Sequence, residues 1–314
     1  MFKKRLNSTN GTFPVRVRPF RIKISFNHIH RLQILLLAAL LGVNFTHCQK
    51  LNNLAKGQKR LEYIHAPKMK LLIPASVFLP EEYYNSDKKK ETRYPVVILL
   101  HGYGGDHAQW SRIADLKQMA NKTKTILVCP DGGKDSWYFN TFSDTANFYY
   151  ERHIIKEVIT HIDTNYRTLG AKGRAITGLS MGGHGALRFV SLYPDSFVAA
   201  GSMSGILDLR VFPLSWNIAK RLGPMKDFPQ RWKMNSCVNL VAQLQGKNKG
   251  ILVECGKEDF ALGVNRAYRD SAAVHHVKIT YREDSGGHTS QFWKDHLEEH
   301  LNFLHNCFPK PKEE

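Results

Sequence analysis

The 314-residue sequence has few cysteines and lacks the usual signatures of metal and phosphate sites. Its five cysteines are scattered and include no C-x-x-C pair, so they give neither a disulfide framework nor a structural zinc site. No histidine spacing has the character of a metal site, and no glycine-rich phosphate loop or internal repeat occurs. The sequence therefore calls for neither a metal nor an organic cofactor.

Acidic residues are absent from residues 1–50, which contain nine lysines and arginines. This segment carries half of the formal net charge of +18, so the rest of the chain is only mildly basic. The high charge is therefore no evidence for binding to nucleic acid, and no nucleic-acid partner is expected. The triplet Lys88-Lys89-Lys90 is expected to be a solvated hairpin turn.

The first part of the chain also lacks an apolar run long enough for an ordinary membrane span. Residues 32–43 form an apolar core of about a dozen residues after a basic stretch, which is typical of a secretory signal peptide. We expect a leader over 1–48, a linker over 49–70, a catalytic domain over 71–308 and a tail over 309–314. The leader predicts export to the periplasm or the outside of the cell.

Two alternatives to a cleaved signal peptide stay open. Cys48 lies just after the apolar core, where a bacterial lipoprotein is cut and lipidated, but His47 stands where a small residue is expected. The second alternative is an uncleaved signal anchor. No stable membrane partner is expected unless Cys48 is lipidated.

A serine stands in the frame G-x-S-x-G at residues 178–182, after an apolar run and before a helix-like segment. This frame is typical of a nucleophile elbow, a sharp strand-to-helix turn that lifts a serine hydroxyl above the end of a sheet. The turn strains the backbone of Ser180, and side chains at Gly178 and Gly182 would collide across it. We predict a strand over 173–177, a helix over 186–193 and Ser180 as the nucleophile.

A nucleophilic serine needs a base, and the base needs a carboxylate that orients it. Asp259 follows an apolar strand predicted over 250–256, and His288 follows another over 277–282. Because ligands bind outside the carboxyl ends of the strands in open α/β sheets, these side chains are expected to meet at one edge. The sequence therefore predicts a catalytic triad of Ser180, Asp259 and His288.

Neighbouring residues compete for these roles. Glu258 is the alternative acid; Asp259 is preferred because it matches the motif, which leaves Glu258 as an exposed loop charge. His296 and His300 lie one turn apart on a helix predicted over 291–304, and both are expected to be solvated rather than functional.

The negative oxygen of an acyl-transfer intermediate needs two amide donors. One donor follows the nucleophile, which here is the amide of Met181. The other comes from a glycine-rich loop after an earlier strand, and His101-Gly102-Tyr103 follows a buried strand predicted over 96–100. We assign the second donor to the amide of Tyr103.

The remaining chain predicts a mostly parallel sheet flanked by helices. Further strands are expected over 71–79, 125–131 and 197–203, with a helix over 149–166. The long connection from Gly205 to Lys249 is rich in bulky residues and is either a short cap over the acyl pocket or simple packing at the sheet edge. Gly104, Trp137 and Trp216 are candidates for substrate binding.

Four of the cysteines lie within this predicted domain. Cys129 and Cys255 end apolar strands that are not expected to be neighbours, so both are expected to be buried thiols. Cys237 and Cys307 can pair only if the fold brings them together.

From about Ser76 to Leu304 the chain resembles the putative esterase family of the α/β-hydrolase superfamily. The resemblance rests on Leu100-His101-Gly102-Tyr103-Gly104-Gly105 with Trp110, on Gly178-Leu179-Ser180-Met181-Gly182-Gly183, and on Arg93-Tyr94-Pro95-Val96-Val97, Ile162-Asp163-Thr164-Asn165-Tyr166-Arg167, Cys255-Gly256-Lys257-Glu258-Asp259-Phe260 and Gly286-Gly287-His288. It implies an α/β-hydrolase fold, the triad named above and the oxyanion donors of Tyr103 and Met181. The family contains S-formylglutathione hydrolases, tributyrin-type, feruloyl and acetylxylan esterases, and mycolyltransferases.

Three functions fit this resemblance. The leader favours a secreted carboxylesterase that removes short acyl, acetyl or feruloyl groups from small-molecule or polysaccharide-linked esters. A cytosolic S-formylglutathione hydrolase is the first alternative, and the leader counts against it. An acyltransferase or non-catalytic binding module is the second, and an intact triad disfavours a dead scaffold. A homo-oligomer stays open.

Overall fold

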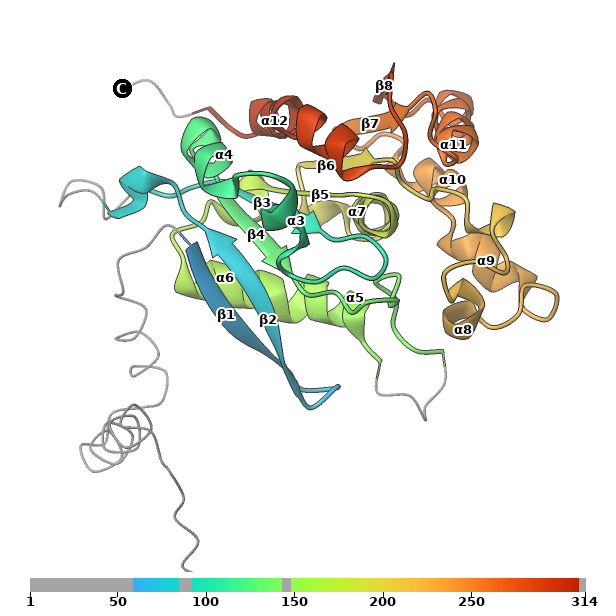
Figure 1. Cartoon of the computed structure of the whole chain (residues 1–314), viewed down its shortest axis with the longest axis horizontal. Helices are drawn as coiled ribbons and strands as arrows, with labels where there is room; N and C mark the ends of the chain where they lie inside the picture. The colour runs from blue at the N-terminus through green and yellow to red at the C-terminus, as the bar shows by residue number, and fades with distance from the viewer. Residues whose placement is uncertain (1–58, 85–91, 143–147, 311–314) are drawn as a thin grey trace, which may run out of the picture. The chain divides into compact units, whose positions relative to one another are not determined.

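The computed structural model describes residues 59–84, 92–142 and 148–310, and Figure 1 shows how their helices and strands are arranged. The predicted leader over 1–48, Cys48 and the triplet Lys88-Lys89-Lys90 lie outside the described residues. Within the described ranges, no helix combines the length and the apolar character that a membrane crossing requires.

One sheet of eight strands organises the described part of the chain, in the order β1-β2-β4-β3-β5-β6-β7-β8. Six neighbouring strands run parallel, and β1 and β2 are added antiparallel at one edge. This is the predicted mostly parallel sheet. The strands are β1 Lys59–Ala66, β2 Leu71–Phe78, β3 Val96–Leu100, β4 Ile126–Pro130, β5 Arg174–Gly178, β6 Ala199–Met203, β7 Gly250–Gly256 and β8 Thr280–Asp284.

Helices cover both faces of the sheet (Figure 1). Because side chains alternate along a strand, Ile98 and Leu100 of β3 enter one core, whereas Val97 and Leu99 enter the other. The first core packs against the π-helical turn η3 His153–Val158, which follows α5 Tyr150–Arg152, and against α6 Ile159–Asn165, α7 Met181–Leu192 and α11 Leu262–Val274. The second packs against α3 Gln109–Ile113, α4 Leu116–Thr123 and α12 Ser290–Asn306.

Short 3₁₀ turns connect several of these elements, namely η1 Glu81–Tyr84, η4 Gly170–Gly173 and η5 Pro194–Ser196. The predicted elements differ from the observed ones mainly at their ends. Helix α7 begins at Met181, five residues before the predicted start, because the glycines after Ser180 are helical. Strand β8 ends at Asp284 instead of residue 282.

The predicted linker over 49–70 is wrong for Lys59–Ala66, which form strand β1. In this strand exposed and buried side chains alternate, and Glu62 is one of the buried ones. The Glu62 carboxylate accepts hydrogen bonds from the Tyr166 hydroxyl and, at 3.1 Å, from Nε2 of His161. Because the inward-facing Glu62 is charged, the sequence does not show an apolar face over this strand. The partners that allow its burial lie about a hundred residues away in the chain.

The segment 205–249 folds into short helices beside α7 and α11. These helices are η6 Leu209–Val211, α8 Ile218–Leu222, α9 Pro229–Asn235, α10 Cys237–Leu240 and η7 Val241–Leu244. Asn235 of α9 is held by two buried side chains of α7, since its carbonyl accepts from Nε2 of His184 at 2.8 Å and its Oδ1 accepts from Nε of Arg188 at 3.0 Å. With Trp232 fully buried, this half of the segment packs against α7 and α11. The half that contains Trp216 reaches the site described below.

The four described cysteines are free thiols. Cys129 and Cys255 are buried on strands that are not neighbours, as expected. Cys237 and Cys307 do not pair, since the thiol of Cys237 donates to the carbonyl of His184 and that of Cys307 to the carbonyl of Phe303.

The prediction that His300 is solvated is wrong, because α12 packs on the sheet and its ring is fully buried. Its Nδ1 makes a short hydrogen bond to the buried carboxylate of Glu254, and its Nε2 lies 2.7 Å from Oγ1 of Thr177. Burial alone would raise the pKa of Glu254, but the neighbouring His300 and Arg282 outweigh it and lower that pKa. The ring of His296 is only half-buried and stacks on Phe292.

Replacing His300 with alanine is therefore expected to destabilise the fold by about 3 kcal/mol, because Glu254 would remain buried without its nearest partner. Urea unfolding of the variant, followed by circular dichroism, measures this loss. His296→Ala is the matched control on the same helix and should stay within about 1 kcal/mol of the wild type. Equal unfolding midpoints for the two variants would contradict the assigned role of His300.

Candidate active site

Ser180 lies in a tight turn between β5 and α7. Its backbone has φ 54° and ψ −116°, a sparsely populated conformation for a residue with a side chain. A Cβ at Gly178 would lie 2.4 Å from the carbonyl carbon of Gly182, and a Cβ at Gly182 would lie 2.3 Å from the carbonyl oxygen of Leu100. Glycine is therefore required at both positions, as the frame G-x-S-x-G predicts.

The structure brings Ser180, His288 and Asp259 together. Nε2 of His288 lies 2.9 Å from Oγ of Ser180, and its Nδ1 lies 3.1 and 3.0 Å from the two carboxylate oxygens of Asp259. Because the ionised carboxylate can only accept, Nδ1 carries a proton, which leaves Nε2 of the neutral ring free to accept from the hydroxyl. The arrangement is that of a nucleophile, a base and an orienting acid.

Asp259 has the environment of an ionised acid. Its side chain is fully buried, whereas that of His288 is 19% exposed. Burial alone would raise the pKa of the carboxyl, but the hydrogen bond and charge of His288 and the backbone amide of Ala261 outweigh it and lower that pKa. The buried carboxylate therefore stays charged at neutral pH and stabilises a proton on the histidine.

Glu258, the alternative acid, makes different contacts. Its carboxylate accepts from the backbone amide of Gly286, and its own amide donates to the Gly286 carbonyl at 3.1 Å. It therefore holds the loop that carries His288 and does not contact the histidine ring in the manner of Asp259. The sequence does not indicate that Glu258 holds this loop, because nothing near it distinguishes it from an ordinary exposed charge.

The two predicted oxyanion donors are the amides of Met181, which directly follows Ser180, and of Tyr103. The Met181 amide is the first of α7, so it has no carbonyl partner within the helix. The Tyr103 amide follows β3, and among the described residues it donates to no backbone carbonyl. Both amides are therefore free to bind an oxygen of a substrate.

His101 fixes the loop that contains Tyr103. Its buried ring accepts from the Gly132 amide through Nε2 at 2.8 Å, so its Nδ1 carries the proton and donates to the Gly102 carbonyl at 2.8 Å. The Gly102 amide in turn donates to Oε1 of Gln109 at 2.7 Å. The sequence motif includes His101 but does not reveal that both ring nitrogens hold backbone groups.

A pocket of about 210 Å³ opens above Ser180 and His288. Trp137 and Trp216, two of the three predicted substrate-binding residues, line it together with Gly102, Tyr103, Gln109, Leu179, Phe260 and Trp293. Gly104, the third, is not among the residues that line the pocket. The glycine has φ +75° and turns its amide away to the Lys134 carbonyl, at 2.6 Å.

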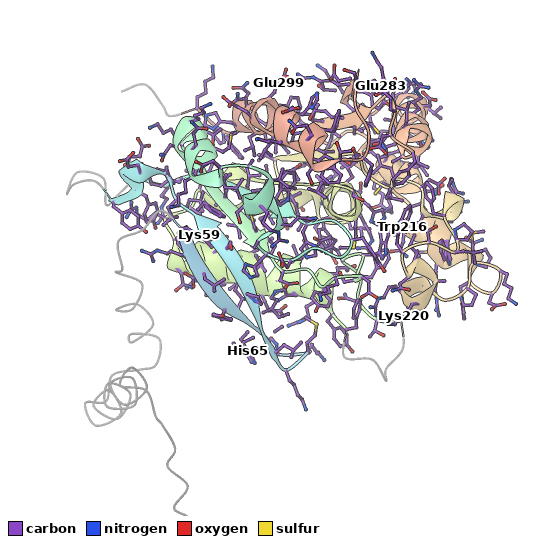
Figure 2. All side chains as sticks on the ribbon, in the orientation of Figure 1. Lys59, His65, Trp216, Lys220, Glu283 and Glu299 are labelled. Carbon is purple, nitrogen blue, oxygen red and sulfur yellow. The ribbon has the colours of Figure 1, made fainter. Side chains whose placement is uncertain are left out.

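Aromatic side chains form one wall of this pocket. The ring of Trp216 stacks on Phe260 with centroids 5.5 Å apart, and Phe260 in turn lies 4.5 Å from the ring of His288. Trp293 approaches the same histidine edge-on at 5.1 Å. Phe260 and Trp293 are not predicted from the sequence as pocket residues, although Phe260 directly follows the predicted acid. Trp216 is labelled in Figure 2.

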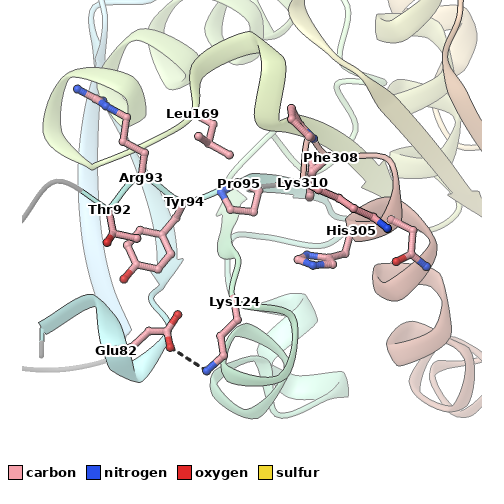
Figure 3. A pocket seen from close by; sticks show the side chains of 12 residues that line it. Glu82, Thr92, Arg93, Tyr94, Pro95, Lys124, Leu169, His305, Phe308 and Lys310 are labelled. Carbon is pink, nitrogen blue, oxygen red and sulfur yellow. Dashed lines mark hydrogen bonds and ion pairs between the residues drawn. The ribbon is translucent and has the colours of Figure 1, made fainter. Parts of the chain in front are cut away.

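A larger cavity of about 520 Å³ lies near the other end of β3 (Figure 3). It is lined by apolar side chains, among them Pro95 and Phe308, and by the ion pair of Glu82 and Lys124 at 2.9 Å. None of Ser180, His288 and Asp259 is among the described residues that line it. The smaller pocket is therefore the candidate active site.

Comparisons with known proteins agree with this geometry. A family model described as Putative esterase matches residues 66–304. The acetyl esterase of Caldicellulosiruptor saccharolyticus is 27% identical over 240 residues, which cover 69% of this chain and 85% of that protein.

Two solved structures share the fold. A ferulic acid esterase has a TM-score of 0.68 and 26% identity, covering 81% of this chain and 100% of that one. The S-formylglutathione hydrolase of Staphylococcus aureus has a TM-score of 0.69 and 20% identity, covering 79% and 98%. Because the family model spans most of the chain and a Ser–His–Asp arrangement lies at the predicted positions, this chain belongs to the putative esterase family and is a carboxylic ester hydrolase of the serine type, with an α/β-hydrolase fold.

Proposed function

We propose that Ser180 is the nucleophile of this esterase, that His288 is its general base and acid, and that Asp259 orients the histidine. The observation that carries the proposal is the continuous chain of contacts from Ser180 through the His288 ring to the buried Asp259 carboxylate. Ser180 and His288 face the pocket, and among the described residues the amides of Tyr103 and Met181 donate to no backbone carbonyl.

The geometry supports a two-step reaction. His288 takes the proton of the Ser180 hydroxyl while Oγ attacks the ester carbonyl, and the amides of Tyr103 and Met181 bind the negative oxygen that forms. The alcohol then leaves with the proton from His288. Water repeats the attack on the acyl-enzyme, assisted by the same histidine, and releases the acid.

The substrate that we propose is a short acyl ester of a carbohydrate, with an acetyl or feruloyl acyl group. A pocket of about 210 Å³ with aromatic walls suits a small or planar acyl group. The relatives named an acetyl esterase and a ferulic acid esterase support the same choice. The basic leader adds to it, because polymeric carbohydrate lies outside the cytoplasm.

Ser180→Ala should lower kcat/KM by at least ~10⁴-fold without unfolding the protein, because only the oxyanion donors and substrate binding remain. Hydrolysis of p-nitrophenyl acetate, methyl ferulate, acetylated xylan and S-formylglutathione by both proteins measures this and ranks the substrates. A variant that kept more than a tenth of the activity would refute the nucleophile, since such a loss is under ~1.4 kcal/mol. S-formylglutathione as the best substrate would favour the thioesterase.

Asp259→Asn should lower kcat by roughly 10³–10⁴-fold, because an amide cannot hold the His288 tautomer that accepts from the serine. Glu258→Gln is the matched control at the neighbouring position. Its side-chain oxygen can still accept from the Gly286 amide, so activity should stay within about threefold of the wild type. Steady-state kinetics of both variants decide the assignment, and the reverse order would move the acid to Glu258.

We propose further that the protein is exported and loses about 48 leader residues. The support is the basic stretch and short apolar core of the sequence. Intact mass of the native protein should show a mature N-terminus near Cys48 or Gln49, and added diacylglycerol mass on Cys48 would identify a lipoprotein. An unprocessed Met1 in a cytosolic fraction would refute export.

A further inference from the structure

The loop of residues 132–138 packs against the backbone of the oxyanion loop, residues 101–105. The Gly104 amide donates to the Lys134 carbonyl at 2.6 Å, and the Tyr138 hydroxyl donates to the His101 carbonyl at 2.8 Å. Together with the bond from the Gly132 amide to the His101 ring, these contacts reach both sides of Tyr103. The position of the Tyr103 amide therefore depends on this bridging loop.

The bridging loop also holds the half of the segment 205–249 that contains Trp216 and α8, which we call the cap. Arg221 of α8 donates from Nε to the Asp135 carbonyl at 3.0 Å and makes a short ion pair with the Asp135 carboxylate. Nε1 of Trp137 donates to the Trp216 carbonyl at 2.9 Å. The cap is thus fixed to the same loop that fixes the oxyanion loop.

Asn217 joins the cap directly to Tyr103. Its Nδ2 donates to the Tyr103 hydroxyl at 3.2 Å and to Oδ2 of Asp135 at 3.1 Å. A carboxamide nitrogen has two hydrogens, so each of these acceptors receives one. Asp135 therefore fixes the orientation of the carboxamide, and the carboxamide fixes the phenol ring of Tyr103.

The backbone at this junction is strained. Trp137 and Tyr138 have φ values of 55° and 58°, and Trp216 and Asn217 have 47° and 57°. Left-handed conformations cost on the order of 1–3 kcal/mol for residues with side chains and persist only where surrounding contacts hold them, often at functional sites. Asparagine tolerates this conformation better than most residues, which suits position 217.

We propose that Asn217 is a positioning residue for the oxyanion hole, which acts by holding Tyr103 through its hydroxyl. The inference rests on the proposed function, in which the Tyr103 amide binds the negative oxygen. A displacement of about 1 Å can cost about 100-fold in rate, so a tether on the donor's own side chain affects the transition state more than the bound substrate. The cap thereby sets the geometry of the chemistry as well as the shape of the pocket.

Asn217→Gly tests the tether, because glycine keeps the left-handed backbone and removes only the carboxamide. Tyr103→Phe removes the hydroxyl that accepts the hydrogen bond from Asn217. Each variant should lower kcat for p-nitrophenyl acetate by about 10-fold and leave KM within about twofold, because the lost contact acts on the transition state. The double variant should lose no more than either single variant, because both remove one shared link.

A trifluoromethyl ketone inhibitor, whose adduct with the serine places a negative oxygen in the oxyanion hole, gives an independent readout. Its affinity should fall about 10-fold in both variants, in parallel with kcat. If Asn217 and Tyr103 had a purely structural role, the variants would have a lower melting temperature, but kcat and inhibitor affinity would keep their wild-type values. Asn248→Gly, the same change at an exposed loop residue, should leave kcat, KM and inhibitor affinity at wild-type values.

Wild-type kcat in Asn217→Gly and Tyr103→Phe would overturn the tether, and so would losses that multiply in the double variant. Ser180→Ala, assayed in the same series, separates this result from a failure of the proposed function. If Ser180→Ala is inactive and the Asn217 variant is normal, only the tether is wrong. If Ser180→Ala is active, the proposed function itself is wrong.

Discussion

The close approach of α7 to β3 and β5 is the contact on which the site depends. At this crossing the Gly182 backbone lies so near Gly178 and the Leu100 carbonyl that a Cβ on either glycine would overlap other atoms. The approach forces Ser180 into its unusual φ and ψ values and points the start of α7 at the pocket. A larger residue at either glycine would move the helix, and with it the hydroxyl and the Met181 amide together.

The other parts of the site are placed by the same sheet. Because β3, β5, β7 and β8 run parallel, the loops that carry Tyr103, Ser180, Asp259 and His288 all leave one edge. These loops are further fixed by polar contacts. The His101 ring binds backbone groups around the oxyanion loop, and the Glu258 carboxylate binds the Gly286 amide in the loop that carries His288. The proposed catalytic groups are thus held by a rigid sheet and by hydrogen bonds formed before substrate arrives.

Local patterns in the sequence predict most of this architecture. Strands β3 and β7 lie at the predicted residues, because short buried runs bounded by turn residues carry their own signal. The sequence predicts the side chains that meet at the pocket where a motif surrounds them, as for Ser180. Strand β1 was missed because Glu62 interrupts its apolar face, and its partners Tyr166 and His161 are distant in sequence. The link from Asn217 to Tyr103 joins residues 114 apart and leaves no local pattern.

His288 and His300 each lie between a buried carboxylate and a hydroxyl group, and exposure separates their roles. His288 lies between Asp259 and a serine hydroxyl at the wall of an open pocket, and 19% of its side chain is exposed. His300 lies between Glu254 and a threonine hydroxyl, yet it is fully enclosed between α12 and the sheet. The chemistry of the two sets is alike, but an ester can reach only the first. A proton held by His300 has no substrate to receive it, so that pair can only contribute to the stability of the fold. The sequence singles out His288 by the glycines before it and by its place after a predicted strand, but it does not reveal that His300 is buried, because that depends on how α12 packs.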